Sequence, residues 1–234
     1  REGKDDEEVS ASLLSAVSTL MFNQLRTLLT ASIDELVEFF EKFAIEEQDV
    51  DADLPAELLA SEAVTHRPLF VVKMVVEGES YKFSPSLPTL LKTVLGTIDH
   101  FVAMLNTVPR VEAELGKGTG HRLLTIATPD DEIVLVARER LKAIIETNFD
   151  VTERMMKVYT PFAYLLFSET EKKVLDFNAS LKPLAEVTAE VGKYEKARKE
   201  VEKRSQPEVR FMLFTIACGA VKTKLAARAD EMIE

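Results

Sequence analysis

The sequence has one cysteine and no tryptophan among its 234 residues. A single thiol excludes an internal disulfide framework, so the chain is expected to belong to a reducing compartment. Cys218 follows the apolar run Phe-Met-Leu-Phe-Thr-Ile-Ala at 211–217. Because cysteine is among the residue types most often buried, we predict that Cys218 is an inert core thiol.

The sequence also lacks a long apolar run and an N-terminal signal. Its longest apolar stretch, 211–221, is interrupted by Thr215 and Gly219 and is much shorter than the ~20 residues that a bilayer requires. Residues 1–8 contain no initiator methionine and no apolar signal core, and residues 226–234 stop within a helical pattern. We therefore expect a cytoplasmic segment of a longer protein, without a membrane span.

Positive charge is in deficit, with 29 Lys and Arg against 40 Asp and Glu and a formal net charge of −11. Binding to nucleic acid or to an anionic membrane needs clustered cations that displace counterions. The run at 193–204 alternates in sign, which is typical of a solvated helix face with i, i+4 pairs. We expect other proteins as partners, with no nucleic acid and no membrane.

The glycine-rich stretch at 116–120 superficially resembles a phosphate-binding loop. That loop requires Gly, four residues, and then Gly-Lys-Ser/Thr. Here Val111 stands where the first glycine belongs, and Lys117 is followed by Gly118. The spacing fails, and we interpret the stretch as a linker within a mobile and dispensable loop at 112–128.

Other candidate sites fail on spacing as well. The acidic run 49–53 imitates half of a calcium loop, but Leu54 and Ala60 occupy the required Gly and Glu positions. His66, His100 and His121 lie far apart, and Ser84 and Ser86 lack a Gly-x-Ser-x-Gly turn. No carboxylate pair stands out as an acid and base in an apolar setting. We predict no catalytic, cofactor-binding or metal-binding residues and no enzymatic activity of this chain.

Apolar residues at three- and four-residue spacing predict most of the chain to be helical. In the first helix this row comprises Leu13, Val17, Leu20, Leu25, Leu28, Leu36, Phe40 and Phe43. Ser86 is a candidate N-cap for the helix that follows it. The predicted helices span 9–43, 55–60, 87–106, 130–147, 151–167, 169–204 and 219–233, with a dent at Pro161 and a kink at Pro183.

Three short runs rich in β-branched and aromatic residues predict strands at about 69–76, 80–83 and 209–216. The first two form a hairpin, which is marginal alone in water, so the third run is expected to pair with the first. The predicted fold is mainly α, an elongated array of antiparallel helices in bundles with a small two- or three-stranded sheet. Its expected segments are 1–65, 66–168 and 169–234.

Short sequence motifs occur along nearly the whole chain and, taken together in their order, resemble those of one protein family. They are 20–26 (Leu-Met-Phe-Asn-Gln-Leu-Arg), 32–36, 39–40, 68–70, 83–87 (Phe-Ser-Pro-Ser-Leu), 108–112 (Val-Pro-Arg-Val-Glu), 159–166, 194–196, 207–210 (Pro-Glu-Val-Arg), Cys218 and 221–225. In this order they resemble the part of the axonemal dynein heavy-chain tail that precedes the linker and the motor ring.

The resemblance implies a structural segment that links an ATP-driven microtubule motor to its attachment on the doublet, in the axoneme of a cilium or flagellum. ATP and Mg²⁺ would act in the motor of the parent chain, and none of the motor's nucleotide- or microtubule-binding residues lies here. Expected partners are neighbouring tail segments, another heavy chain, or dynein light or intermediate chains. The alternatives are a free-standing helical adaptor outside any motor and a small enzyme with an unrecognised site.

Overall fold

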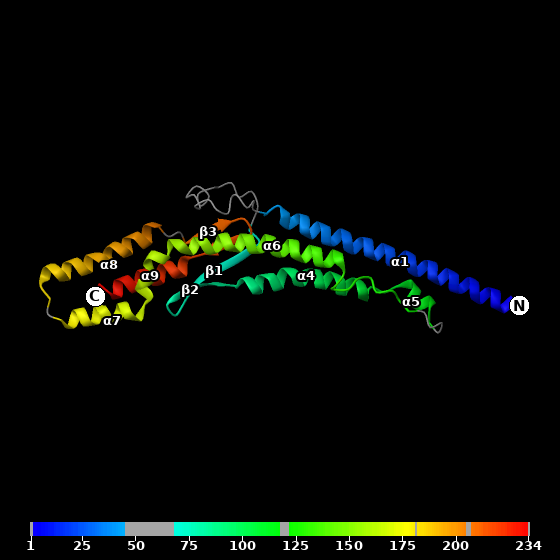
Figure 1. The fold of residues 1–234 in the computed structure, drawn as a ribbon, viewed down its shortest axis with the longest axis horizontal. Helices are drawn as coiled ribbons and strands as arrows, with labels where there is room; N and C mark the ends of the chain where they lie inside the picture. The colour runs from blue at the N-terminus through cyan, green and yellow to red at the C-terminus, as the bar shows by residue number, and fades with distance from the viewer. Residues whose placement is uncertain (1, 45–67, 118–121, 181, 205–206, 234) are drawn as a thin grey trace. The chain divides into compact units, whose positions relative to one another are not determined.

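The computed structural model describes residues 2–44, 68–117, 122–180, 182–204 and 207–233 (Figure 1). Helices dominate the described residues, as predicted, and a small mixed sheet accompanies them. The helices are α1 (Glu2–Glu41), α4 (Leu87–Thr107), α5 (Val111–Leu115), α6 (Glu132–Arg154), the 3-10 helices η1 (Met155–Val158) and η2 (Thr160–Leu166), α7 (Ser168–Ala179), α8 (Leu184–Arg204) and α9 (Gly219–Glu231). The strands are β1 (Phe70–Glu77), β2 (Ser80–Ser84), β3 (Glu208–Phe211) and β4 (Phe214–Ala217). In the described part of the chain, no helix is long and apolar enough to cross a membrane.

The chain divides into two compact units, each built from two stretches of sequence. Unit 1 comprises residues 1–44 and 90–144, and unit 2 comprises residues 45–89 and 145–234. Helix α6 therefore contributes its first part to unit 1 and its last part to unit 2. The predicted short helix 55–60 and the acidic run 49–53 lie outside the described residues.

Unit 1 contains α1, most of α4, α5 and the first part of α6. Two ion pairs join α1 to the residue before α6 and to the middle of α6, Arg26 with Asp131 and Glu41 with Arg140. Because the pairs follow the same order in both segments, α1 and α6 run in the same direction. The buried apolar side chains of its helices are Leu14, Leu25, Leu29, Ile33, Val37 and Phe40 of α1, Leu90, Val94, Ile98 and Val102 of α4, and Val134, Ala137 and Leu141 of α6, and Phe43, just after α1, is buried as well.

The apolar row predicted for the first helix is wrong in part. Leu13, Leu20 and Leu28 are 62%, 57% and 55% exposed, whereas Leu14 and Leu29, one position further along, are buried. A helix has 3.6 residues per turn, so a sequence with two apolar rows permits either row to face the core. The row that packs here includes Ile33 and Val37, and the other row remains on the surface.

Unit 2 is built around a four-stranded sheet in the order β2-β1-β4-β3. The predicted β1–β2 hairpin is confirmed, and Gly78 occupies its turn with a φ of 61°, a left-handed conformation that favours glycine. The predicted long-range pairing is also confirmed, because β1 pairs with β4 in parallel from Phe70 opposite Phe214 to Lys73 opposite Ala217.

The predicted single strand at 209–216 is wrong. The chain turns at Met212, which has a φ of 43°, and at Leu213, so the segment forms an antiparallel hairpin of β3 and β4. The sheet therefore has four strands instead of two or three. Leu213 has no exposed surface, and its carbonyl accepts hydrogen bonds from the backbone N–H groups of Leu69 and Phe70 at 3.0 and 2.9 Å. Burial of this turn against β1 accounts for the departure from a continuous strand.

Proline shapes the helices of unit 2 more strongly than predicted. The expected helix 169–204 is divided into α7 and α8, with Ser180 extended (φ −92°, ψ 119°). Pro183 disfavours helix at the preceding residue, and its carbonyl instead accepts the first hydrogen bonds of α8 from Glu186 and Val187. Similarly, the helix expected at 151–167 is not a separate α-helix. Its first residues belong to α6, which ends at Arg154, and the following residues form the two 3-10 helices η1 and η2, with a proline in the first turn of η2.

Candidate functional site

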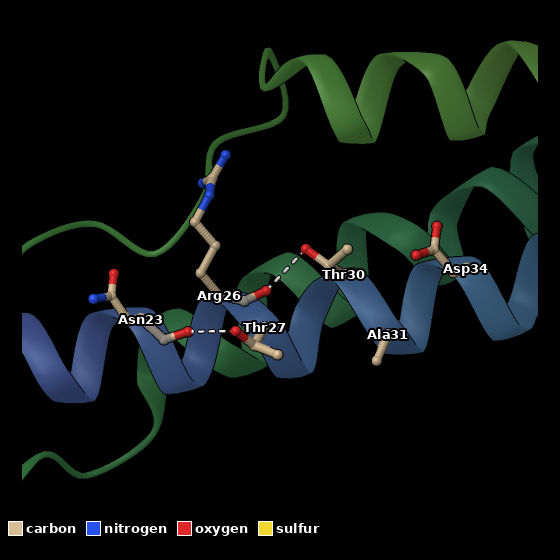
Figure 2. A pocket seen from close by; sticks show the side chains of 6 residues that line it. All are labelled: Asn23, Arg26, Thr27, Thr30, Ala31 and Asp34. Atoms are coloured by element: carbon tan, nitrogen blue, oxygen red, sulfur yellow. Dashed lines mark hydrogen bonds between the residues drawn. The ribbon is translucent and has the colours of Figure 1, made fainter.

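The first candidate is a groove along one face of α1 in unit 1 (Figure 2). All six of its lining residues come from this one helix and follow each other at intervals of one or three positions. They are Asn23, Arg26, Thr27, Thr30, Ala31 and Asp34. A second groove shares Arg26 and Asp34 but has an apolar floor from α1 and α6, comprising Ile33, Val37, Ile133, Val136 and Ala137.

Arg26 connects α1 to the segment that precedes α6. Figure 2 shows its guanidinium directed away from α1 toward that segment. Nη1 donates to the Ile126 carbonyl at 2.8 Å, and Nη2 lies 3.0 Å from Oδ1 of Asp131. The hydrogen bond from Arg26, joined by one from the backbone N–H of Thr128, holds the pKa of Asp131 below its usual value, and the same bond to Asp131 raises the pKa of Arg26. Arg26 is therefore engaged in holding the fold together.

Two hydroxyl groups of this groove are bonded to the backbone of their own helix. The hydroxyl of Thr27 donates to the Asn23 carbonyl at 2.9 Å, and that of Thr30 donates to the Arg26 carbonyl at 3.0 Å. Figure 2 shows both bonds running along the helix. Neither hydroxyl is paired with a histidine or carboxylate that would activate it as a nucleophile. The groove has the character of a contact surface.

Two further polar contacts fix the segment before α6. The Asn106 amide donates from Nδ2 to the Ala127 carbonyl at 2.8 Å and accepts from the Ile126 N–H at 2.9 Å. Arg110 donates from Nη1 to the Leu124 carbonyl at 2.5 Å and from Nε to Glu112 Oε1 at 2.6 Å. The side chains of Arg110 and Glu112 are only 4% and 0% exposed.

These contacts correct the prediction that 112–128 is a mobile and dispensable loop. Both ends of that segment are packed, because Glu112 is fully buried and Ile126 and Ala127 are 1% and 3% exposed. The sequence predicted no role for Asn106, Arg110 or Glu112. The signal was the Val-Pro-Arg-Val-Glu piece at 108–112, which carries the buried pair within a break between helices.

Residues weighed for metal binding do not assemble in the described structure. Among the described residues, no group of three or more His, Cys, Asp or Glu side chains is placed to hold a metal ion. His100 is exposed on α4, whereas His66, His121 and the run 49–53 lie outside the described residues.

The glycine-rich stretch and the serines occupy ordinary structural positions. Gly116 ends α5, and Lys117 forms an exposed ion pair with Glu114; residues 118–120 lie outside the described residues. Ser84 ends β2. Ser86 precedes α4, as its predicted N-cap role requires, and its Oγ lies 3.1 Å from Oγ1 of Thr89.

Cys218 is buried, as predicted, with 3% of its surface exposed. It lies between β4 and α9, and its Sγ is 4.0 Å from the Ile216 carbonyl. Burial raises the pKa of the thiol, which a hydrogen bond involving Tyr159 partly offsets. A raised thiol pKa disfavours the reactive thiolate, so the structure supports a core role for Cys218.

Comparison with known proteins relates the chain to dynein heavy chains. No protein-family model matches it. It is 24% identical to the dynein axonemal heavy chain 12 of Rattus norvegicus over 97% of this chain, and 24% identical to that of Mus musculus over 82% of this chain. The chain spans 7% and 6% of the length of these two relatives. The similarity thus extends over most of this chain and a small part of each heavy chain.

Proposed function

We propose that this chain is a structural segment of an axonemal dynein heavy-chain tail, which links the ATP-driven motor to its attachment and associated chains. The observation that carries the proposal is the similarity to a dynein axonemal heavy chain along 97% of this chain. The match covers 7% of that heavy chain, which is consistent with one segment of a much longer polypeptide. The proposed location is the axoneme of a cilium or flagellum.

A role in transmitting force fits the architecture of the two units. In unit 2, parallel pairing of β1 and β4 joins residues that are far apart in sequence through four consecutive register pairs. In unit 1, the contacts of Arg26, Asn106 and Arg110 fix the segment between α5 and α6 to α1, to α4 and to the residue that precedes α5. Neither arrangement presents a catalytic group to a substrate. We therefore propose that the segment is a non-catalytic spacer.

The proposed partners are proteins. A net charge of −11 disfavours direct binding to acidic surfaces, including tubulin, nucleic acid and anionic membranes. Neighbouring tail segments, a second heavy chain, or light or intermediate chains are the proposed contacts. ATP and Mg²⁺ belong to the motor of the proposed parent and have no proposed site in this chain.

The test is to determine the reading frame that encodes this chain. A tail segment requires the frame to continue into a linker and a ring of ATPase modules. The chain should also be found in isolated axonemes and be extracted together with dynein arms. A frame that encodes no motor would overturn the proposal and favour the free-standing adaptor.

A further inference from the structure

The seam of α8 in unit 2 is covered along only half of its length. This seam, defined as Leu184, Val187, Val191, Tyr194 and Val201, has the three- and four-residue spacing of helices that pack side by side. Tyr194 and Val201 are 2% and 0% exposed. By contrast, Leu184 is 81% exposed and Val187 is 37% exposed. The half of the seam that lies nearer the start of α8 is therefore exposed.

The covered half of the seam is occupied by α9, which runs antiparallel to α8. Lys222 near the start of α9 donates to the Glu202 carbonyl at 3.2 Å, and Asp230 near its end lies 2.7 Å from Arg198. Along α9 the contacts therefore progress toward the start of α8. The buried row of α9 is aliphatic and consists of Val221, Leu225 and Ala229, and Met232, directly after the helix, is buried as well.

The end of α9 is held between α7 and α8. Arg228 forms an ion pair of 2.9 Å with Glu171 at the start of α7, while Asp230 is paired with Arg198 of α8. Figure 1 shows this end of α9 between the two helices. The axis of α9 therefore points along α7 and along the exposed first half of α8.

Helix α7, which lies on the opposite side of α9 from α8, also has an apolar row that is incompletely buried. Thr170, Val174 and Phe177 recur at four- and three-residue spacing and are half-buried, yet no residue of α7 is fully buried. A helix whose apolar row remains incompletely covered lacks the packing that normally stabilises it, because most helical stability in proteins comes from burying such a row.

We propose that the uncovered faces of α7 and α8 are covered by a helix of the same polypeptide, formed by residues that follow position 234 and continuing the line of α9. This inference rests on the proposed function, in which the chain is one segment of a longer heavy chain. At 1.5 Å per residue, the fourteen positions from Arg198 back to Leu184 span about 21 Å, so about 10 to 14 further helical residues complete the cover. The occupant carries aliphatic residues at three- and four-residue spacing, as α9 does.

The experiment compares the 234-residue chain with a chain extended by about 30 residues of its own reading frame, enough for the helix and a margin. Amide hydrogen exchange is measured for residues 184–191 and 170–177. The expected result is that exchange at 184–191 slows by about 100-fold in the extended chain, because local opening there becomes coupled to a packed helix. Equal exchange rates in the two chains would overturn the inference and leave the proposed function standing.

Two matched variants of the extended chain complete the test. Leu184→Asp on the seam should abolish the added protection, whereas Leu175→Asp should retain it, because Leu175 is 63% exposed and lies off the Val174–Phe177 face. Loss of protection in both variants would overturn the inference. A dimer of the 234-residue chain that Leu184→Asp dissociates would make a second copy the occupant and would also overturn it. A reading frame that stops at Glu234 would overturn both this inference and the proposed function.

Discussion

Phe70 and Phe214 are direct partners in the parallel pairing of β1 and β4, and their ring centroids lie 5.9 Å apart. The ring of Phe214 also meets Phe149, at 5.9 Å and nearly perpendicular. Phe214 is fully buried, so β1, β4 and the end of α6 share one aromatic contact at the centre of unit 2. Aromatic pairs of this geometry contribute about 0.5–1.5 kcal/mol beyond the area they bury.

Phe214→Asp should unfold the β1–β2 hairpin together with the C-terminal part of unit 2. The substitution places an uncompensated carboxylate in an apolar site and should cost at least about 4 kcal/mol. The measurement is amide exchange of residues 70–84. Val71→Asp is the matched control, because Val71 is 59% exposed on the same sheet. A hairpin that stays fully protected in the Phe214 variant would contradict the proposed coupling.

Glu112→Gln should destabilise unit 1 strongly. The Arg110 guanidinium lies 2.5 Å from Glu112 Oε1, and removal of the carboxylate charge leaves a buried cation without its counter-ion. We expect a loss of about 3 to 5 kcal/mol in urea unfolding. Glu114→Gln, which alters an exposed pair, should change the free energy by less than about 0.5 kcal/mol. Similar effects of the two substitutions would show that burial does not strengthen the dependence of Arg110 on Glu112.

Asp131→Asn should lower stability at neutral pH, and the loss should shrink in acid. Arg26 holds the folded pKa of Asp131 below the usual 3.8, so the ionised carboxylate stabilises the fold above that value. This contribution disappears as the pH falls through the folded pKa. Both side chains are partly exposed, so the effect at pH 7 should be about 1 kcal/mol.

The comparison requires unfolding curves of wild type and variant at several pH values below and above 3.8. Asp130→Asn, at an exposed neighbouring position, is the matched control for the loss of one negative charge before α6. A difference between wild type and the Asp131 variant that stays constant into acid would indicate that the side chain acts through hydrogen bonding alone.

Replacement of residues 116–120 by a neutral linker of equal length should leave thermal unfolding nearly unchanged, since the cost of loop closure depends on loop length, which the replacement keeps. Ile126→Asp should lower the unfolding temperature by many degrees, because Ile126 is 1% exposed and its backbone is bonded to Arg26 and Asn106. A large drop from the linker replacement would show that the glycine stretch itself contributes to packing.

The purified chain should hydrolyse no ATP and should not pellet with microtubules at moderate salt. The sequence lacks a phosphate-binding loop, and its charge of −11 opposes an acidic tubulin surface. Sustained phosphate release that resists further purification would contradict the first part. Saturable co-sedimentation with microtubules would contradict the second.

Local signals predicted most elements of this fold correctly. Ser86 and the apolar spacing after it predicted α4, Asp130 and Asp131 predicted the start of α6, and β-branched composition predicted the hairpin. The pairing of β1 with β4 followed from the scarcity of strand-like runs, because a two-stranded hairpin needs a further partner. Apart from this long-range pairing, the correct predictions depend on interactions between residues that are close in sequence, such as capping and apolar spacing.

The failures have a common cause in tertiary context. A left-handed backbone conformation, as Met212 has, is rare for a non-glycine residue, so no local signal predicted the turn between β3 and β4. The choice between the Leu28 and Leu29 rows of α1 depends on the helices that pack against it. The buried Arg110–Glu112 pair was missed because charged residues between helices usually face water.

The parallel register of β1 and β4 determines how unit 2 would respond to tension. Parallel strands begin at the same end of the sheet, so a pull on the start of β1 and on the end of β4 acts at opposite ends of the pair. Such a pull slides the strands along each other and stresses their hydrogen bonds simultaneously. A β1–β2 hairpin pulled at its open end would instead separate one bond at a time, at lower force. The topology therefore gives this small sheet a direction in which it is hard to extend.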